Sequence, residues 1–187
     1  MAISHYENLP FEIPDNWVWY RLDDICAFEN GYAFSSNEYK SEGIPLIRIS
    51  NIKNGDIDLS DCTYIEESEN IDDKFHIQKG DLLIAMSGAT TGKMGIYNFS
   101  DLAYLNQRVG NIKIRNREVL FDKYRNFFML VHSNEILKMA HGGAQPNISS
   151  KIMAQIFFPL PPYEEQKRIV NEITKLFSAL DTIAESL

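Results

Sequence analysis

Cysteine and histidine are scarce in this sequence. Its 187 residues include 2 cysteines and 4 histidines, and neither type recurs at the spacing that holds a metal ion. Cys26 and Cys62 cannot make a disulfide framework, so we expect two thiols in a reducing cytoplasm. The sequence therefore predicts no metal site, and it excludes the disulfide-rich secreted class.

Long apolar runs are also missing. No stretch approaches the roughly 18 apolar residues of a membrane helix, and residues 1–16 lack the basic region and apolar run of a signal peptide. The apolar fraction of 44%, with 12% aromatic residues, is nevertheless enough for a hydrophobic core. We expect a cytoplasmic protein that has no membrane partner.

Catalytic motifs fail wherever the sequence comes close to one. Residues 88–93 (GATTGK) resemble a phosphate loop, but they are one residue short between the glycines, and Met94 replaces the magnesium-binding hydroxyl. Residues 160–163 (LPPY) resemble a methyltransferase motif, but Leu160 cannot accept a hydrogen bond from an amine. Residues 165–167 (EQK) resemble the Glu-x-Lys pair of metal-dependent nucleases. In those enzymes the pair lies on a strand, whereas here it lies at the start of the predicted last helix. No catalytic triad or nucleotide fingerprint follows from spacing. The sequence predicts no catalytic residue and no cofactor.

Basic side chains are scarce in the first third of the chain. Residues 1–73 carry 4 basic and 16 acidic groups, whereas residues 74–117 carry 7 basic and 2 acidic groups, within a net charge of −8. Two interpretations of this basic segment stay open. It is either a solvated surface or one basic face of a subunit that binds DNA weakly alone and tightly in an assembly. The seven basic residues are Lys74, Lys79, Lys93, Arg108, Lys113, Arg115 and Arg117.

Hydrophobic patterning predicts an α/β (α+β) fold, with a β-rich body, peripheral helices and a long C-terminal helix of coiled-coil type. Short strands are expected at residues 17–22, 44–50, 82–86, 93–97 and 109–114. Residues 122–140 have the pattern of one or two amphipathic helices, with Asp122 as a candidate N-cap. A short helix capped by Ser149 or Ser150 and an extended segment follow, and Pro162 begins the last helix.

The last helix carries the clearest repeat of the sequence. Its apolar residues are spaced 4, 3, 4, 3, 4, which is the heptad pattern of paired helices. A helix of about 24 residues would be roughly 36 Å long, which favours pairing with another domain or chain over packing on its own domain. Val170, Phe177 and Ala184 form a second apolar line. The predicted helix-pairing residues are Ile169, Ile173, Leu176, Leu180, Ile183 and Leu187.

Several segments together resemble the specificity subunits of type I restriction-modification systems. The two most specific are GGAQPNI at residues 142–148 and PLPPYEEQ at residues 159–166. The others, in the same order as in the family, are LPFEIPDNW at residues 9–17 with Leu22, NGYAF at 30–34, GIPLIRISNI at 43–52, KGDLLIAMSG at 79–88 and NQRV at 106–109. Together they span nearly the whole chain.

The resemblance implies a non-catalytic DNA-reading subunit. In the family, two target-recognition domains are separated by two antiparallel spacer helices, and methyltransferase subunits bind this frame and are joined by a restriction subunit. Residues 1–160 would be one recognition domain, and residues 161–187 the start of a spacer helix. The implied partners are double-stranded DNA, the methyltransferase and restriction subunits, and a second recognition half in the same or another chain. Whether the chain is a fragment, a truncated gene product or a half-subunit that pairs with itself stays open, as does which half it is.

The resemblance also implies which residue types contact which part of the DNA. Lys, Arg and backbone N–H groups hold phosphates, while Arg, Asn, Gln and hydroxyl side chains read base edges. The alternatives are scaffold roles, such as turn formation by Asn147 or a buried salt bridge of Arg108. A protein-only adaptor and an enzyme are the rival functions. The candidate DNA-binding residues are Tyr32, Phe34, Ser35, Lys40, Ser87, Thr90, Thr91, Lys93, Asn106, Gln107, Arg108, Gln145 and Asn147.

Overall fold

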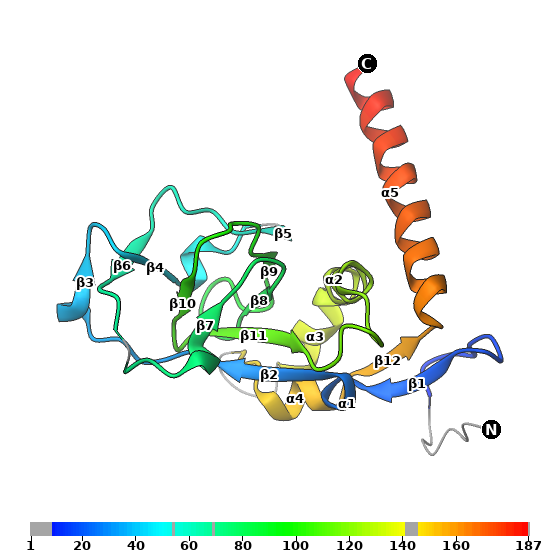
Figure 1. The fold of residues 1–187 in the computed structure, drawn as a ribbon. Coiled ribbons are helices and arrows are strands. Elements are labelled where there is room, and N and C mark those ends of the chain that lie inside the picture. Colours follow the sequence, from blue (N-terminus) through cyan, green and yellow to red (C-terminus); the bar gives the residue numbers. More distant parts are fainter. Residues whose placement is uncertain (1–8, 54, 69, 141–145, 187) are drawn as a thin grey trace.

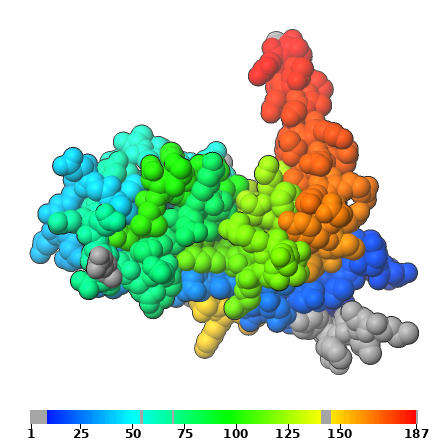
Figure 2. All heavy atoms as spheres, viewed as in Figure 1, coloured from blue at the N-terminus to red at the C-terminus, as the bar shows by residue number. Residues whose placement is uncertain are grey.

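A sheet-rich body and one long helix make up the molecule (Figure 1). The structure is a computed structural model, and it describes residues 9–53, 55–68, 70–140 and 146–186. The helix, α5 (Tyr163–Glu185), leaves the body at one end and projects away from it. Figure 2 shows its C-terminal half standing clear of the body.

The larger sheet has the strand order β2-β11-β8-β9-β5 and lies at the centre of the body. Strand β11 pairs antiparallel with both β2 and β8, and the edge strand β5 runs parallel to β9. Apolar clusters cover both faces of the sheet, so β8 is buried throughout. The strands are β2 (Cys26–Asn30), β5 (Gly55–Asp56), β8 (Leu82–Ala85), β9 (Met94–Ile96) and β11 (Val109–Ile114).

The second five-stranded sheet is the smaller one, because its strands contain fewer residues in total. It has the order β3-β6-β4-β10-β7 and lies away from α5 (Figure 1). The strand predicted at residues 44–50 ends early, because Asn51 accepts a hydrogen bond from the backbone N–H of Arg48 and closes a 3₁₀ turn at Ile49–Asn51. The strands are β3 (Tyr39–Lys40), β4 (Ile44–Ile47), β6 (Thr63–Ile65), β7 (His76–Ile77) and β10 (Ala103–Leu105).

A two-stranded ribbon connects the body to the long helix. β1 (Val18–Arg21) pairs antiparallel with β12 (Phe157–Leu160), and a single turn, α1 (Leu22–Ile25), follows β1. Pro162 is the N-cap of α5, as its lack of an N–H favours. The two distant ends of the body thus meet where α5 begins.

Three short helices cover one face of the larger sheet. The predicted helical segment splits at His132 into α2 (Asp122–Val131) and α3 (Ser133–Met139). Asp122 is the first residue of α2, and Phe121 takes the N-cap position instead. Ser149 caps α4 (Ser150–Ala154) by accepting a hydrogen bond from the Ile152 N–H, as the sequence predicts.

The first turns of α5 are fixed to the body by one buried amide. Gln166 has no exposed surface. Its Oε1 accepts a hydrogen bond from the Phe121 N–H at 2.8 Å, and its Nε2 donates to the Val119 and Pro161 carbonyl oxygens at 2.9 Å each. Val170 is buried against the same core. Every polar atom of the Gln166 amide therefore has a partner, and the direction of α5 is set by the fold of the body.

Farther along, α5 presents apolar side chains to solvent. Phe177 stacks on Phe127 of α2, with 6.3 Å between ring centroids, whereas Leu176, Leu180 and Ile183 are 65%, 58% and 57% exposed. Of the other predicted pairing residues, Ile169 and Ile173 are half-buried, and Leu187 lies outside the described residues. Within the part of the chain that the structure describes, no helix has the length and apolar character needed to cross a membrane.

Candidate nucleic-acid interface

Five candidate residues meet along one margin of the body, which we call the recognition edge. Gln107 and Arg108 occupy the tip of a tight turn between β10 and β11, closed by the Val109 N–H donating to the Asn106 carbonyl oxygen at 2.8 Å. Such a turn directs its two central side chains outward, and both are exposed. The members of the edge are Tyr32, Ser87, Gln107, Arg108 and Asn147.

Backbone hydrogen bonds join these residues across the chain. The Gln107 N–H donates to the Tyr32 carbonyl oxygen at 2.9 Å. On the other side of the turn, the Arg108 carbonyl accepts from the Met86 N–H at 2.9 Å, and the Met86 carbonyl accepts from the Ile148 N–H at 2.8 Å. A bridge between Ser87 and Asn147 continues the series. Four segments far apart in sequence, at Tyr32, Met86–Ser87, Gln107–Arg108 and Asn147–Ile148, are therefore held side by side.

Gly31 makes the close approach at the start of this edge possible. A Cβ atom at this position would lie 2.1 Å from the Asn106 carbonyl oxygen and 2.4 Å from that of Leu105. The Gly31 backbone N–H donates to the Val109 carbonyl oxygen at 3.2 Å. The glycine in the segment NGYAF is thus required by backbone packing, and it positions the neighbouring Tyr32.

Arg108 is available to a ligand. Its backbone is fixed by the turn, while its guanidinium forms no ion pair with any described residue. The alternative that Arg108 is a buried salt-bridge partner is therefore wrong, because the side chain is exposed. An arginine at this tip has the fork of donors that pairs with two acceptors of a guanine edge.

Tyr32 stands beside further aromatic and basic side chains. Its ring is 42% exposed and makes edge contacts with Phe34 and Phe75, at centroid distances of 4.9 and 5.3 Å. Lys74 lies over the Phe75 ring at 4.9 Å and also pairs with Asp72. Phe75 was not among the predicted residues, and it reaches this place through the 3₁₀ turn at Asp73–Phe75.

Three candidate residues are buried inside the fold, and a fourth caps a turn at the surface. Phe34 is buried and stacks on Tyr104, and Thr91 is buried and donates to the Gly88 carbonyl oxygen at 2.6 Å. Asn106 is buried in its turn, while the Ser35 hydroxyl caps the turn at Ser36–Glu38. The three buried side chains are therefore poorly placed for contact with DNA, whereas Ser35 is exposed and stays a candidate.

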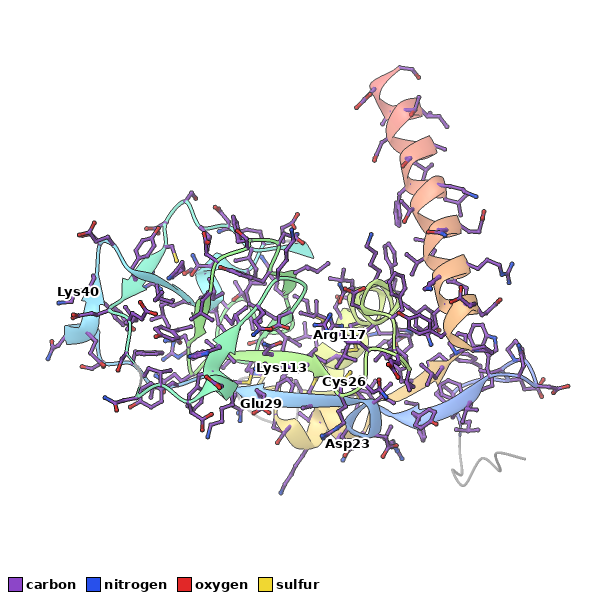
Figure 3. The ribbon with its side chains drawn as sticks, viewed as in Figure 1. Asp23, Cys26, Glu29, Lys40, Lys113 and Arg117 are labelled. Atoms are coloured by element: carbon purple, nitrogen blue, oxygen red, sulfur yellow. The ribbon has the colours of Figure 1, made fainter. Side chains whose placement is uncertain are left out.

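Lys40 is not joined to the recognition edge by the backbone hydrogen bonds described above. It belongs to the outermost strand of the smaller sheet, and Figure 3 shows it at the end of the body away from α5. Glu38, Glu66 and Glu67 line the same shallow cleft as Lys40. Carboxylates repel phosphate, so this end of the body is a poor DNA contact. Gln145 lies outside the described residues.

The basic segment does not form one face, contrary to the interpretation that favoured a single DNA-binding patch. Lys113 donates to the Lys74 carbonyl oxygen at 3.1 Å, whereas Arg115 donates to the Asp23 carbonyl oxygen at 3.0 Å beside α1. Lys93 lines a cleft next to α3. Lys113 lies on β11, which ends at Ile114, whereas Arg115 follows the strand, so these two basic side chains have different neighbours although they are close in sequence.

Other buried polar groups stabilise the scaffold. The Arg125 guanidinium is 1% exposed and donates to the carbonyl oxygens of Ile112 and Gly80 and to the Asn126 side chain. Burial lowers its pKa. Burial also raises the pKa of the Cys26 thiol to about 11, so this thiol stays protonated at neutral pH. Within the described ranges, no three His, Cys, Asp or Glu side chains form a group suited to a metal ion.

Comparison with known proteins decides the family. Residues 14–187 match the model of the type I restriction modification DNA specificity domain. The chain belongs to this family. Among its curated relatives, the type I restriction enzyme EcoAI specificity subunit of Escherichia coli is 32% identical over 187 residues, which cover 95% of this chain and 31% of that protein. The MjaVIII specificity subunit of Methanocaldococcus jannaschii is 26% identical, over 91% of this chain and 41% of that protein.

Solved structures share the fold of this specificity domain. The HsdS subunit from Thermoanaerobacter tengcongensis superimposes with a TM-score of 0.76 at 20% identity, over 96% of this chain and 42% of that one. A chain from a structural study of assembly and conformational transition in a type I restriction-modification system gives a TM-score of 0.77 at 18% identity, over 97% of this chain and 43% of that one. The chain thus spans less than half the length of these relatives.

Proposed function

We propose that this chain is a sequence-reading half of a type I specificity subunit, and that the recognition edge reads the bases of one half-site. The observation that carries the proposal is the exposed turn of Gln107 and Arg108, joined by backbone hydrogen bonds to Tyr32 and, through Met86, to the Ser87 and Asn147 segments. Arginine, amide and hydroxyl side chains are the groups that discriminate base edges in a major groove. A rigid backbone holds them in one place.

The chain divides into two functional parts in this proposal. Residues 1–160 form the target-recognition domain, and residues 161–187 begin the spacer helix. The exposed stripe of Leu176, Leu180 and Ile183 supports the second role, because large aliphatic side chains gain free energy when another helix covers them. The covering helix belongs to the second recognition half, in the same or another chain.

The remaining partners follow from family membership. We propose that methyltransferase subunits bind the assembled specificity subunit in the cytoplasm, that a restriction subunit joins through them, and that this chain itself performs no chemistry. The direction of α5, fixed through Gln166, then sets where the recognition edge lies relative to those subunits.

Replacement of Arg108 by Ala is expected to relax the preference for one base pair, at a cost of about 1–3 kcal/mol for the preferred sequence. The measurement is the affinity of the complete specificity subunit, with its methyltransferase subunits, for the target duplex and each single-base variant. Lys40→Ala serves as the control, because Lys40 lies at the acidic end of the body, and it should leave every preference unchanged. A folded Arg108→Ala complex with the wild-type order of preference would remove Arg108 from the reading residues.

A further inference from the structure

A cleft separates the loop between β8 and β9 from helices α2 and α3. It has a volume of about 620 Å³. Thr90 and Lys93 line it on the loop side, and Ser133 and Asn134 on the helix side, with Leu130 and Leu137 among the apolar residues between them. We call it the loop–helix cleft. Ser133 and Asn134 were not among the predicted residues, because the cleft exists only where α3 packs beside the loop.

The electrostatic character of this cleft is unusual for an acidic chain. Its lining contains Lys93 and, among the described residues, no carboxylate. By contrast, Asp23 lines the cleft beside α4, and Glu135 lines the one beneath α3. Lys93 is exposed and forms no ion pair with any residue that the structure describes. The loop–helix cleft is therefore suited to a negatively charged group.

The polar groups of the cleft can all donate hydrogen bonds. The Lys93 ammonium, the Ser133 hydroxyl and the Asn134 amide each have N–H or O–H groups to offer. The Thr90 hydroxyl is buried without a partner among the described residues. Thr90 lines the cleft, so rotation about its χ1 can turn this hydroxyl toward a ligand there. Non-bridging phosphodiester oxygens only accept hydrogen bonds, so they match this set.

The cleft and the recognition edge share one loop. Ser87 begins the loop and is bridged to Asn147 at the edge, while Lys93 ends it. The loop is held in place because the Gly92 N–H donates to the Ala85 carbonyl oxygen at 2.9 Å. Gly92 also packs so closely on Leu137 that an added Cβ would lie 3.3 Å from the Leu137 Cβ. The cleft therefore lies at the far end of the same loop that begins at the recognition edge.

We infer that the loop–helix cleft binds a backbone phosphate of DNA next to the half-site, with Lys93 as the cation that holds it. This inference rests on the proposed function and extends it. Base edges are read on one side of the Ser87–Lys93 loop, and a phosphate is held on the other side, which fixes the register of reading. The contact is independent of sequence.

Substitution of Lys93 by Gln tests the inference in the complete specificity subunit with its methyltransferase subunits. One phosphate contact contributes about 0.9 to the slope of log K against log salt, which corresponds to about eightfold in affinity at roughly 0.1 M salt. K93Q should therefore weaken binding about eightfold to target and non-target duplexes alike and lower the slope by about 0.9. Lys93→Arg should keep the wild-type slope. Lys151→Gln, the same charge change on α4 outside the cleft, should not change it.

A scan with single methylphosphonates, which neutralise one phosphate at a time, locates the contact. Wild type should lose affinity at one position next to the half-site, and K93Q should show no loss there. An unchanged slope for K93Q, or an unchanged scan, would overturn the inference even if the complex selects its sequence normally. If instead the wild-type complex selects no sequence but K93Q still removes one phosphate contact, the proposed function fails and the phosphate site stands.

Discussion

Replacing Gln166 by Leu is expected to lower the free energy of unfolding by about 3 kcal/mol or more. Leucine has a similar volume but no polar atoms, so the Phe121 N–H and the carbonyl groups of Val119 and Pro161 lose their partners. Each such group costs about 1–3 kcal/mol when it is left unsatisfied in the interior. Urea unfolding followed by circular dichroism gives the difference.

Gln78→Leu is the matched control for this variant. Gln78 is exposed, and the hydrogen bond of its residue to Asp81 comes from the backbone N–H, which the substitution keeps. Its effect should stay within about 0.5 kcal/mol. A Gln166→Leu protein as stable as the Gln78→Leu control would show that the amide does not fix α5 to the body.

The second large effect concerns the exposed stripe of α5. The double variant Leu176→Asp/Leu180→Asp is expected to weaken helix pairing more than 100-fold, because two carboxylates would have to be buried in an apolar seam, at a cost of several kcal/mol. Sedimentation of the 187-residue chain over a range of concentrations measures the pairing. Wild type should associate through α5, and the double variant should sediment as a monomer.

A control for the stripe lies on the opposite side of the same helix. Ser178 is exposed and lies two residues from both Leu176 and Leu180, about half a turn around the axis from the stripe. Ser178→Asp adds a carboxylate to α5 without entering the seam, so association should persist. Equal association of wild type and the double variant would exclude the stripe as the pairing surface.

Local patterning was sufficient to predict the elements whose signals lie in their own sequence. Strand β11 has the predicted bounds, and α4 begins after the Ser149 cap. The proline at position 162 marks the start of α5. In each case a short-range physical cause, such as strand-forming residues, a capping hydroxyl or a missing N–H, acts within a few residues.

Long-range pairing accounts for what the sequence did not predict. β2, Cys26–Asn30, ends in Glu29 and Asn30 and has little strand character, yet it pairs along its whole length with β11. β10 gains its place between β4 and β7 through contacts with segments far away in the chain. Such partners supply hydrogen bonds and burial that no local pattern reveals.

In the candidate site, too, features with a local cause were predictable, and features with a long-range cause were not. The exposure of Gln107 and Arg108 follows from a local turn, and the sequence indicated both. The burial of Phe34 depends on Tyr104, and the cleft beside Lys93 depends on α3, so neither was predictable from residue type. Gln166 lies between charged residues, and its residue type does not predict burial, because its partners Phe121 and Val119 belong to the distant segment before α2.

Selection from random duplexes tests the central claim most directly. The complete specificity subunit, assembled with its methyltransferase subunits, is mixed with randomised duplex DNA, and the bound fraction is sequenced. The account predicts that a half-site of about three to five bases emerges for this domain, with preference at one position lost when Arg108 is replaced by Ala. A bound pool that carries no sequence preference, from a complex that binds DNA, would contradict it.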